Sequence, residues 1–535
     1  MTPQSLKQWA MCISLFALSA HPHYLRAEVM SPNPGLKYWY PLPMLEKPET
    51  IKTDICVYGG TPGGVGAAVQ AQRSGKKAVL AVFRRHVGGM TSGGLTAVDL
   101  GKKESIGGMA AEFLNSMGKW SDFSSSQAEQ GFRKMLAEAG VKVYYEHRLK
   151  SVEKKDHRIQ ALVFENGNRI EAKVFVDATY EGDLLGRAGV SYHVGRESNA
   201  QYGETINGFQ ITNHHQFKFE VDPYLIAGDP TSGLLPGIMA GSLPEFGSGD
   251  RQIQAYCFRM WATQNNKMSW PKPANYQAED YALLLRYIQT KPEFEWTWTY
   301  KSGPVKLNEG DCNSAGPFSL DYLGKNWAWP EADYPTRERI FQEHVTYQQG
   351  LMWFLANDPR VPESMRLQVN KFGLPQEEFK ETLGWPHELY VREGRRMISD
   401  VVMTEDYCLS KIFPSDSVGL ASYTMDSHNC SRVVVNGVVK AQGDVFKYVP
   451  KPYPVSYKAI VPKEAECSNL LVPVAVSSSH MAFGSIRMEP VFMILGQSAA
   501  IAAATSIDRG VSVQKVDYAE LRTLLLKNGQ ILDVK

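Results

Sequence analysis

A glycine-rich turn near the front of the chain constrains its fold more than any other feature. A short apolar run precedes the turn, an Ala-rich segment that ends near Gly75 follows it, and a second apolar run covers Ala78–Val82. The turn consists of Gly59, Gly60, Thr61, Pro62, Gly63 and Gly64. This order predicts a parallel βαβ unit, whose turn directs backbone N–H groups and the positive end of a helix at one point. Because that arrangement suits a pyrophosphate, the pattern predicts a protein that binds FAD or NAD(P).

The turn departs from the usual dinucleotide pattern in two ways. In the G-x-G-x-x-G spacing that opens at Gly59, Thr61 occupies the second glycine position, so the pyrophosphate approaches the backbone less closely. About 20 residues further on, where an acidic residue normally binds the ribose, the chain has Val82 and then Arg84 and Arg85. Two arginines there would suit the 2′-phosphate of NADP, so an NADP-dependent dehydrogenase is one alternative. A βαβ unit without a nucleotide is another.

Sequence blocks far from the turn resemble the FAD-dependent oxidoreductase family that is related to the flavin subunit of heterodisulfide reductase. These blocks are Val87–Gly94, Ile106–Gly108, Val176–Leu184, Leu389–Arg396 and Tyr457–Ala504. The resemblance extends from residue 54 to about residue 505. It implies FAD as the cofactor, bound at the glycine turn and also at Gly88, Gly89, Met90, Asp177, Gly496 and Gln497. Because relatives have an acidic residue in place of Val82, we expect FAD binding to be weakened here but not abolished.

The resemblance also implies how the chain is organised. It predicts an α/β fold in which an FAD-binding Rossmann-like domain of the glutathione-reductase type is interrupted by a second domain. We expect the FAD-binding domain in residues 50–200, the substrate or cap domain in residues 201–400, and the return of the FAD-binding domain in residues 401–535. Within the first part, the pattern predicts a helix over Gln127–Gly140, a third parallel strand over Val141–Tyr145, a hairpin turn at Asn166-Gly167 and a strand over Ala172–Ala178.

Residues 1–27 are predicted to be a secretory signal peptide. Lys7 supplies one positive charge, Met11–Ala20 forms an apolar core, and Ala20 or Ala27 offers a cleavage site. An N-terminal hydrophobic helix is the alternative. The signal pattern favours a secreted or periplasmic protein.

Composition narrows the function only slightly. The net charge of +1 does not indicate a nucleic-acid partner, and because no apolar run approaches 18 residues we expect no membrane span. The seven cysteines contain no C-x-x-C pair and no iron–sulfur spacing, which favours the branch of the family without clusters. We expect Cys56, in the first strand, to be a buried thiol, while the others could include a disulfide.

Tryptophans gather in the middle of the chain. Eight of the eleven lie between Trp261 and Trp385 and include two pairs with a spacing of two, Trp296 with Trp298 and Trp327 with Trp329. Residues two apart project from the same side of a strand, where flat rings can stack on sugar faces. The pattern is consistent with a carbohydrate-derived substrate, or with a non-catalytic carbohydrate-binding protein. Packing inside the domain is the commoner role of such rings.

Four residues are candidates for catalysis beside the flavin. We predict His480 as the proton acceptor, since an imidazole titrates near neutral pH, and Arg487 as a cation that orients an anionic or carbonyl group. Asp426 and His428 form a second candidate pair that could share a proton with an alcohol. A structural histidine and an ion pair are the alternatives for His480 and Arg487. Asp426 and His428 have no third and fourth ligand nearby in the sequence, so we expect no metal.

Three arginines form a further candidate group. If Arg392, Arg395 and Arg396 belong to a helix, as their surroundings predict, they share one face and could receive a substrate carboxylate or a flavin phosphate. A solvated helix face is the alternative. Since the sequence has one dinucleotide turn, we expect electrons to leave to oxygen, a quinone or a carrier. The sequence thus predicts an FAD-dependent oxidoreductase that acts on a small organic or sugar-derived molecule, with an unknown electron acceptor.

Overall fold

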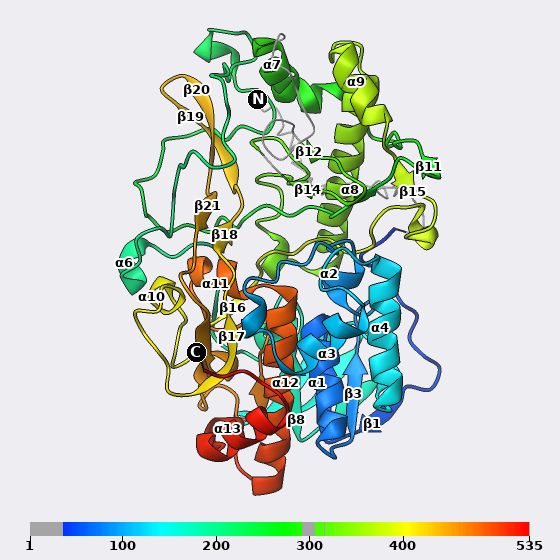
Figure 1. Cartoon of the computed structure of the whole chain (residues 1–535), viewed down its shortest axis with the longest axis vertical. Coiled ribbons are helices and arrows are strands. Elements are labelled where there is room, and N and C mark those ends of the chain that lie inside the picture. Colours follow the sequence, from blue (N-terminus) through cyan, green and yellow to red (C-terminus); the bar gives the residue numbers. More distant parts are fainter. Residues whose placement is uncertain (1–35, 292–304, 315, 534–535) are drawn as a thin grey trace, which may run out of the picture.

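The computed structural model describes residues 36–291, 305–314 and 316–533 (Figure 1). The predicted signal peptide and the pair Trp296 and Trp298 lie outside the described residues. In Figure 1 the blue, cyan, orange and red segments share the lower half of the molecule, and most of the green segments lie in the upper half. The early and late segments of the described residues therefore build one half together.

A five-stranded parallel sheet forms the centre of that lower half. Its strands, in spatial order, are β23 (Leu470–Leu471), β8 (Val174–Asp177), β2 (Ile55–Tyr58), β3 (Ala78–Ala81) and β4 (Lys142–Tyr144). All neighbouring pairs are parallel, and every side chain of β2, β3 and β8 is buried, as expected for strands covered on both faces. The predicted α/β fold with a parallel sheet is confirmed. Because β23 pairs with β8, the chain leaves this sheet and returns to it near its C-terminus.

Two helices pack side by side against this sheet, α1 (Pro62–Arg73) and α12 (Glu489–Arg509) (Figure 1). They approach closely because Gly496 has no side chain, so its backbone lies against the carbonyl of Gly63. Among the described residues, α12 is the one helix that is long and apolar enough to span a membrane, and 94% of its apolar window is buried inside the protein. Further helices of this half are α2 (Gly89–Ser92), α3 (Gly108–Ser116), α4 (Ser125–Glu138), α5 (Asp183–Arg187), α11 (His480–Ile486) and α13 (Tyr518–Lys527).

A small second sheet flanks the first and follows the predicted meander. Its spatial order is β1 (Thr50–Lys52), β7 (Arg169–Glu171), β6 (Arg158–Phe164) and β5 (Leu149–Lys155). Strands β6 and β7 are antiparallel, and Gly167 between them has φ +91°, which a glycine adopts without strain. The hairpin at Asn166-Gly167 and the helix, α4, predicted over Gln127–Gly140 are both present, with ends shifted by two residues or fewer for the helix.

The upper half is built from long loops, short strands and a few helices. Its helices are α6 (Asn199–Tyr202), α7 (Ala282–Thr290), α8 (Tyr334–Asn357) and α9 (Glu363–Asn370). Its strand pairs are β10 (Trp261–Ala262) with β13 (Gly310–Asp311), β11 (Lys267–Met268) with β15 (Leu374–Pro375), and β12 (Val305–Lys306) with β14 (Asn313–Ser314).

Hairpins and short strands from the last third of the chain connect the two halves. The paired strands are β9 (Tyr192–His193) with β16 (Arg396–Met397), β17 (Ser417–Ala421) with β22 (Tyr453–Ser456), β18 (Met425–Ser427) with β21 (Val445–Lys447), and β19 (Ser431–Val435) with β20 (Val438–Gln442). The short helix α10 (Glu405–Cys408) lies beside them. In Figure 1 the β19–β20 hairpin lies in the upper half, and β18 and β21 lie below it toward the lower half.

The predicted helix at Arg392, Arg395 and Arg396 is wrong. This segment has no helix, and β16 begins at Arg396. The three arginines are buried and bind different acids: Arg392 contacts Asp321 at 2.8 Å and Arg395 contacts Asp183 at 3.0 Å, while Arg396 pairs with both Glu197 and Glu393. Extended backbone lets neighbouring arginines reach separate partners, so they do not form one cationic face.

The expectation that Trp327 and Trp329 project together from a strand is also wrong. Trp329 begins a short 3₁₀ helix, Trp329–Glu331, and is fully buried, with its ring 4.7 Å from that of Tyr38. Packing therefore accounts for Trp329. Cys56 is a buried free thiol, as predicted, and the other described cysteines, Cys257, Cys312, Cys408, Cys430 and Cys467, are also buried and form no disulfide.

Candidate functional site

The glycine turn joins β2 to α1 in a way that larger residues would prevent. Gly59 has φ +116°, and a Cβ there would lie 2.5 Å from the Ala178 carbonyl. A Cβ on Gly64 would overlap the carbonyl oxygen of Gly59. Thr61, at the second glycine position of the pattern, caps α1: its hydroxyl accepts a hydrogen bond from the Gly64 N–H at 3.2 Å and donates one to Ala178 at 2.8 Å. Thr61 thus fixes the start of α1.

A cavity opens at the N-terminus of α1. Its walls include Gly59, Gly60 and Thr61 from the turn and Gly89 from the Val87–Gly94 segment. The Gly88 N–H donates to the carbonyl of Gly60 at 2.6 Å, which holds that segment against the turn. Backbone amides and a helix N-terminus that converge on a glycine-lined space fit a dinucleotide pyrophosphate. Pro62, Gly63 and Gly64 form the first turn of α1, directly after the residues that line the cavity.

The adenosine end of the cavity is lined by aromatic rings. Tyr38 stacks on Phe83 with ring centroids 4.8 Å apart, next to the buried side chain of Val82. With these rings in place the cavity measures about 60 Å³, well below the roughly 300–1,000 Å³ of typical ligand pockets. An adenosine would therefore displace Tyr38, or stack against it.

The two arginines that suggested NADP are bound to protein groups. Arg84 donates to the carbonyl of Lys37 at 3.1 Å, and Arg85 donates to the Tyr40 hydroxyl at 2.9 Å and forms an ion pair with Glu146 at 3.2 Å. Both guanidinium groups thus tie the segment before β1 to the end of β3. The Arg84 side chain is 14% exposed, whereas that of Arg85 is 65% exposed.

Three predicted cofactor residues support the turn from outside the cavity walls. Fully buried Asp177 accepts hydrogen bonds from Thr179 and from the Leu185 N–H, and its burial raises its pKa to about 6. Gly496 allows α12 to approach α1, as described above. Gln497 accepts a hydrogen bond from the Met109 N–H at 2.8 Å and so joins α12 to α3.

A buried tyrosine and glutamate connect the cavity to the start of α12. The Tyr180 hydroxyl accepts from the Met90 N–H at 2.9 Å and donates to Glu489 at 2.9 Å. Burial raises the pKa of Glu489 to about 8, so this carboxyl is largely protonated at neutral pH. Tyr180 lies in the Val176–Leu184 block, but its position in the sequence gives no indication of this contact.

His480, the predicted base, is enclosed by protein groups. Its Nδ1 lies 2.7 Å from Glu393 and its Nε2 lies 3.0 Å from the Ser427 hydroxyl. The side chain is 1% exposed, and burial together with the Arg396 charge lowers its pKa to about 3. Both ring nitrogens are therefore occupied, which is the arrangement of a structural histidine.

The other predicted residues lie together at the boundary of the two halves. His428 Nδ1 is 2.7 Å from Asp321, and its Nε2 faces Asp426 at 3.7 Å. Arg487 contacts Asp426 at 3.4 Å and donates to the Tyr390 hydroxyl at 2.8 Å. Although burial opposes ionisation, Arg392 and His428 hold the pKa of Asp321 well below its usual range.

Asp321 was missed because no motif marks it. It precedes His428 by 107 residues and comes from an irregular segment of the upper half. Its role is visible only in space, where it holds the His428 ring with Nε2 directed at Asp426. We call Asp321, His428, Asp426 and Arg487 the His428 cluster.

The chain was compared with protein families, curated proteins and solved structures, and the family match includes the glycine turn. The family model described as FAD dependent oxidoreductase matches residues 54–525. A search of curated proteins found no match. Similar solved structures include Thermovibrio ammonificans THI4 (21% identity, 27% of this chain and 66% of that one, TM-score 0.23), L-proline dehydrogenase from P. horikoshii (15%, 28% and 59%, 0.24) and T. acidophilum thioredoxin reductase (19%, 28% and 40%, 0.19).

These structural similarities span between 40% and 66% of the other chains. The family match, in contrast, covers most of this chain and includes both the glycine turn and the C-terminal helices that pack on it. The protein belongs to the FAD dependent oxidoreductase family, and FAD is its cofactor.

Proposed function

We propose that this enzyme oxidises a small hydroxylated molecule, such as a sugar derivative, and that His428 accepts the hydroxyl proton. When bound, FAD supplies the hydride acceptor for such a reaction. The protein must then orient the substrate and remove a proton. The His428 cluster contains groups suited to both tasks.

One observation carries this proposal: polar contacts on the two sides of the junction between α11 and α12 reach the cofactor cavity and His428. Glu489 and Arg487 lie two residues apart, where α11 ends and α12 begins. Glu489 contacts Tyr180 on the side of the cavity, and Arg487 contacts Asp426 on the side of the cluster. The cluster therefore lies where the cofactor half meets the upper half.

The side-chain exposure and the partners of the two histidines favour His428 over His480 as the proton acceptor. The side chains of His428 and Asp426 are 10% and 13% exposed, compared with 1% for His480. Asp321 orients the His428 ring and stabilises the imidazolium that forms when Nε2 takes a proton. Arg487 supplies positive charge next to Asp426, where it orients an oxygen of the substrate.

Three finer points of the proposal rest on the sequence. The relation to the heterodisulfide reductase subunit rests on the blocks that include Val87–Gly94 and Tyr457–Ala504. The route of electrons to oxygen, a quinone or a carrier rests on the single dinucleotide turn, and export rests on the signal pattern of residues 1–27. Detection of the protein outside the cytoplasm, with residues 1–27 removed, would test the last point.

Anaerobic stopped-flow measurement of flavin bleaching tests the catalytic assignment. A panel of sugars, polyols and sugar acids first identifies a substrate for the wild-type enzyme. His428→Gln should retain its flavin absorbance and reduce the rate of bleaching by about 10²–10⁴-fold. The matched control is His157→Gln, at an exposed histidine far from the cluster in the meander, which should bleach at the wild-type rate.

A different result would identify a different base. If His428→Gln bleaches at the wild-type rate, while His480→Gln is slow and still binds FAD, then His480 is the base and the proposal fails. If no hydroxylated compound bleaches the wild-type flavin, but another class of compound does, the proposed substrate class is wrong.

A further inference from the structure

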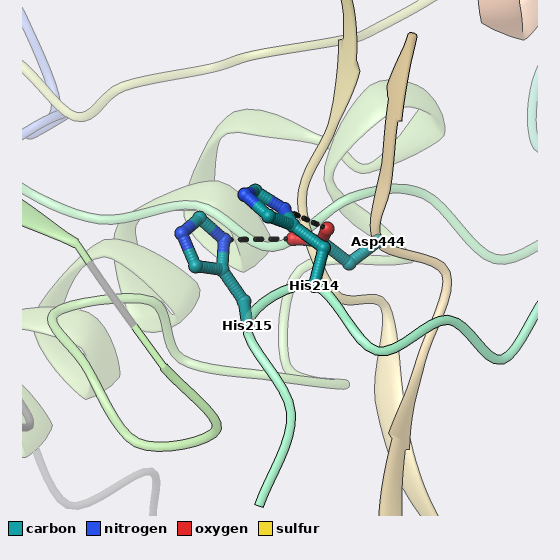
Figure 2. Close-up of side chains that lie close together, drawn as sticks. All are labelled: His214, His215 and Asp444. Carbon is teal, nitrogen blue, oxygen red and sulfur yellow. Dashed lines mark hydrogen bonds and ion pairs between the residues drawn. The ribbon is translucent and has the colours of Figure 1, made fainter. Parts of the chain in front are cut away.

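Two adjacent histidines, His214 and His215, and one aspartate, Asp444, lie close together (Figure 2). His214 Nδ1 lies 2.6 Å from Asp444 Oδ1, and His215 Nδ1 lies 2.9 Å from Asp444 Oδ2. The three ligand atoms lie within 4.8 Å of one another. Figure 2 shows both rings directed at the same carboxylate.

The backbone around these residues is held in place by contacts of its own. Thr212 donates its hydroxyl to the Asp444 carbonyl at 3.0 Å and accepts from the His214 N–H at 3.2 Å. The Gly443 N–H donates to the Gln210 carbonyl at 2.8 Å. The loop that carries the histidines is therefore tied to the connection between β20 and β21, which carries Asp444.

Burial within the group is uneven in the way a metal site requires. The Asp444 side chain is 3% exposed, whereas those of His214 and His215 are 33% and 14% exposed. A buried carboxylate supplies negative charge at the base of the site, and the partly exposed imidazoles leave a side from which an ion and a water ligand can enter. Two histidines and one carboxylate with an open position form a donor set that zinc and other divalent transition metals use.

We propose that His214, His215 and Asp444 bind one divalent transition-metal ion, with Zn²⁺ as the ion that fits best. The ion replaces the protons now shared between the imidazoles and the carboxylate, and a water completes the coordination. Nδ1 of each histidine and one oxygen of Asp444 reach the ion after small rotations of the rings. Zinc takes such nitrogen and oxygen ligands at about 2.0–2.2 Å.

The site lies beside the His428 cluster but does not depend on it. The rings of His215 and His428 are 6.2 Å apart between centroids. An ion at Asp444 would add positive charge near the proposed substrate position. Its three protein ligands do not include Asp321. The metal site stands whether or not His428 is the base.

Isothermal titration calorimetry, with Zn²⁺ added to the holoenzyme after chelator treatment, tests the proposal. We expect one equivalent of Zn²⁺ per chain, with release of protons that changes the apparent heat between buffers. Asp444→Asn and His214→Ala should each weaken binding by about 100-fold or more. This exceeds the roughly 10–100-fold cost of losing a group that only supports a ligand.

Two controls keep the result decisive. His157→Ala removes an exposed histidine elsewhere and should bind Zn²⁺ like the wild type. Because Asp444 is buried, Asp444→Asn could disturb folding, so His214→Ala at the more exposed ligand serves as the second variant, with thermal unfolding recorded for both. The absence of a 1:1 heat in the wild type, or unchanged affinity in folded His214→Ala, would overturn the proposal.

Discussion

The glycine turn and the His428 cluster are built by different forces. The turn is defined by steric limits: Gly59 and Gly64 are close in the sequence, and each permits a backbone approach that a side chain would block. The cluster is defined by charge: Asp321 and His428 come from separate segments and meet as a buried pair, and Arg392 outside the cluster also binds Asp321. A steric limit needs one residue type at one position, whereas a buried ion pair needs only a balancing charge somewhere in the fold. A sterically defined site such as the glycine turn can therefore be predicted from the sequence, whereas a site defined by buried ion pairs cannot.

The largest expected effect tests the steric region. Gly64→Val should abolish FAD binding, because any side chain there overlaps the carbonyl of Gly59 and opens the turn. The flavin absorbance of the purified variant measures this. Gly66→Ala, two residues further along α1, is the matched control: its Cβ would lie no closer than 3.1 Å to a neighbouring atom, so FAD should be retained. A folded Gly64→Val with full flavin absorbance would show that the turn does not hold the cofactor.

The next effect tests the charged region. Asp321→Ala should lower the free energy of unfolding by about 3–5 kcal/mol, because it leaves the buried Arg392 guanidinium without its carboxylate. Chemical denaturation of wild type and variant provides the measurement. Asp508→Ala, which breaks the surface pair with Lys76, should cost less than about 1 kcal/mol. Equal losses of unfolding free energy in the two variants would show that the buried pair contributes no more to stability than the other pair.

A smaller effect concerns a buried histidine that stays neutral, and it appears in the pH dependence of stability. His344 is buried in α8 and donates a hydrogen bond from Nδ1 to the Ile340 carbonyl at 2.7 Å, and burial lowers its pKa to about 4. The unfolded chain protonates this histidine below about pH 6.5 and the native chain does not, so stability falls as the pH drops from about 6.5 to 4. His344→Leu should reduce that acid loss by on the order of 1–3 kcal/mol. An unchanged slope of unfolding free energy against pH would assign the acid loss to other groups.

The smallest effect tests the adenosine end of the steric region. Val82→Glu introduces an acid where a dinucleotide-binding fold normally has one and should strengthen FAD binding by about 1 kcal/mol. Titration of the apoprotein with FAD measures it. Val79→Glu is not a suitable control because it would bury a charge inside β3, so Val82→Gln, which offers hydrogen bonds without charge, serves instead. Equal or weaker affinity in Val82→Glu would mean that the ribose is held elsewhere, for example by the segment that carries Tyr38.

Prediction from the sequence succeeded where structure is local. The βαβ unit, the helix at α4 and the hairpin at Asn166-Gly167 depend on hydrophobic patterns and turn residues within a few tens of positions. Prediction failed at Arg392, Arg395 and Arg396. Their spacing in the sequence is that of one helix face, but in the structure acids from distant segments neutralise their charges. Tertiary ion pairs outweighed the local pattern there.

The same limit applies to the choice of base. His480 and His428 have the same intrinsic chemistry, and both lie in segments rich in small polar residues. Only the packing shows that Glu393 and Ser427 occupy both nitrogens of His480, while Asp321 leaves His428 Nε2 facing a partly exposed carboxylate. His214 and Asp444 are 230 residues apart, so their convergence was equally hidden.

The sequence by itself determined the nucleotide-binding turn, the parallel sheet around it and the flavoenzyme class, because each depends on residues that are neighbours along the chain or on motifs spread over the whole family. The tertiary structure alone decided which histidine is sealed, which acids pair with the three arginines, and where two histidines meet one aspartate. Pairing energies depend on distances between segments and on burial, and both quantities exist only once the chain has folded.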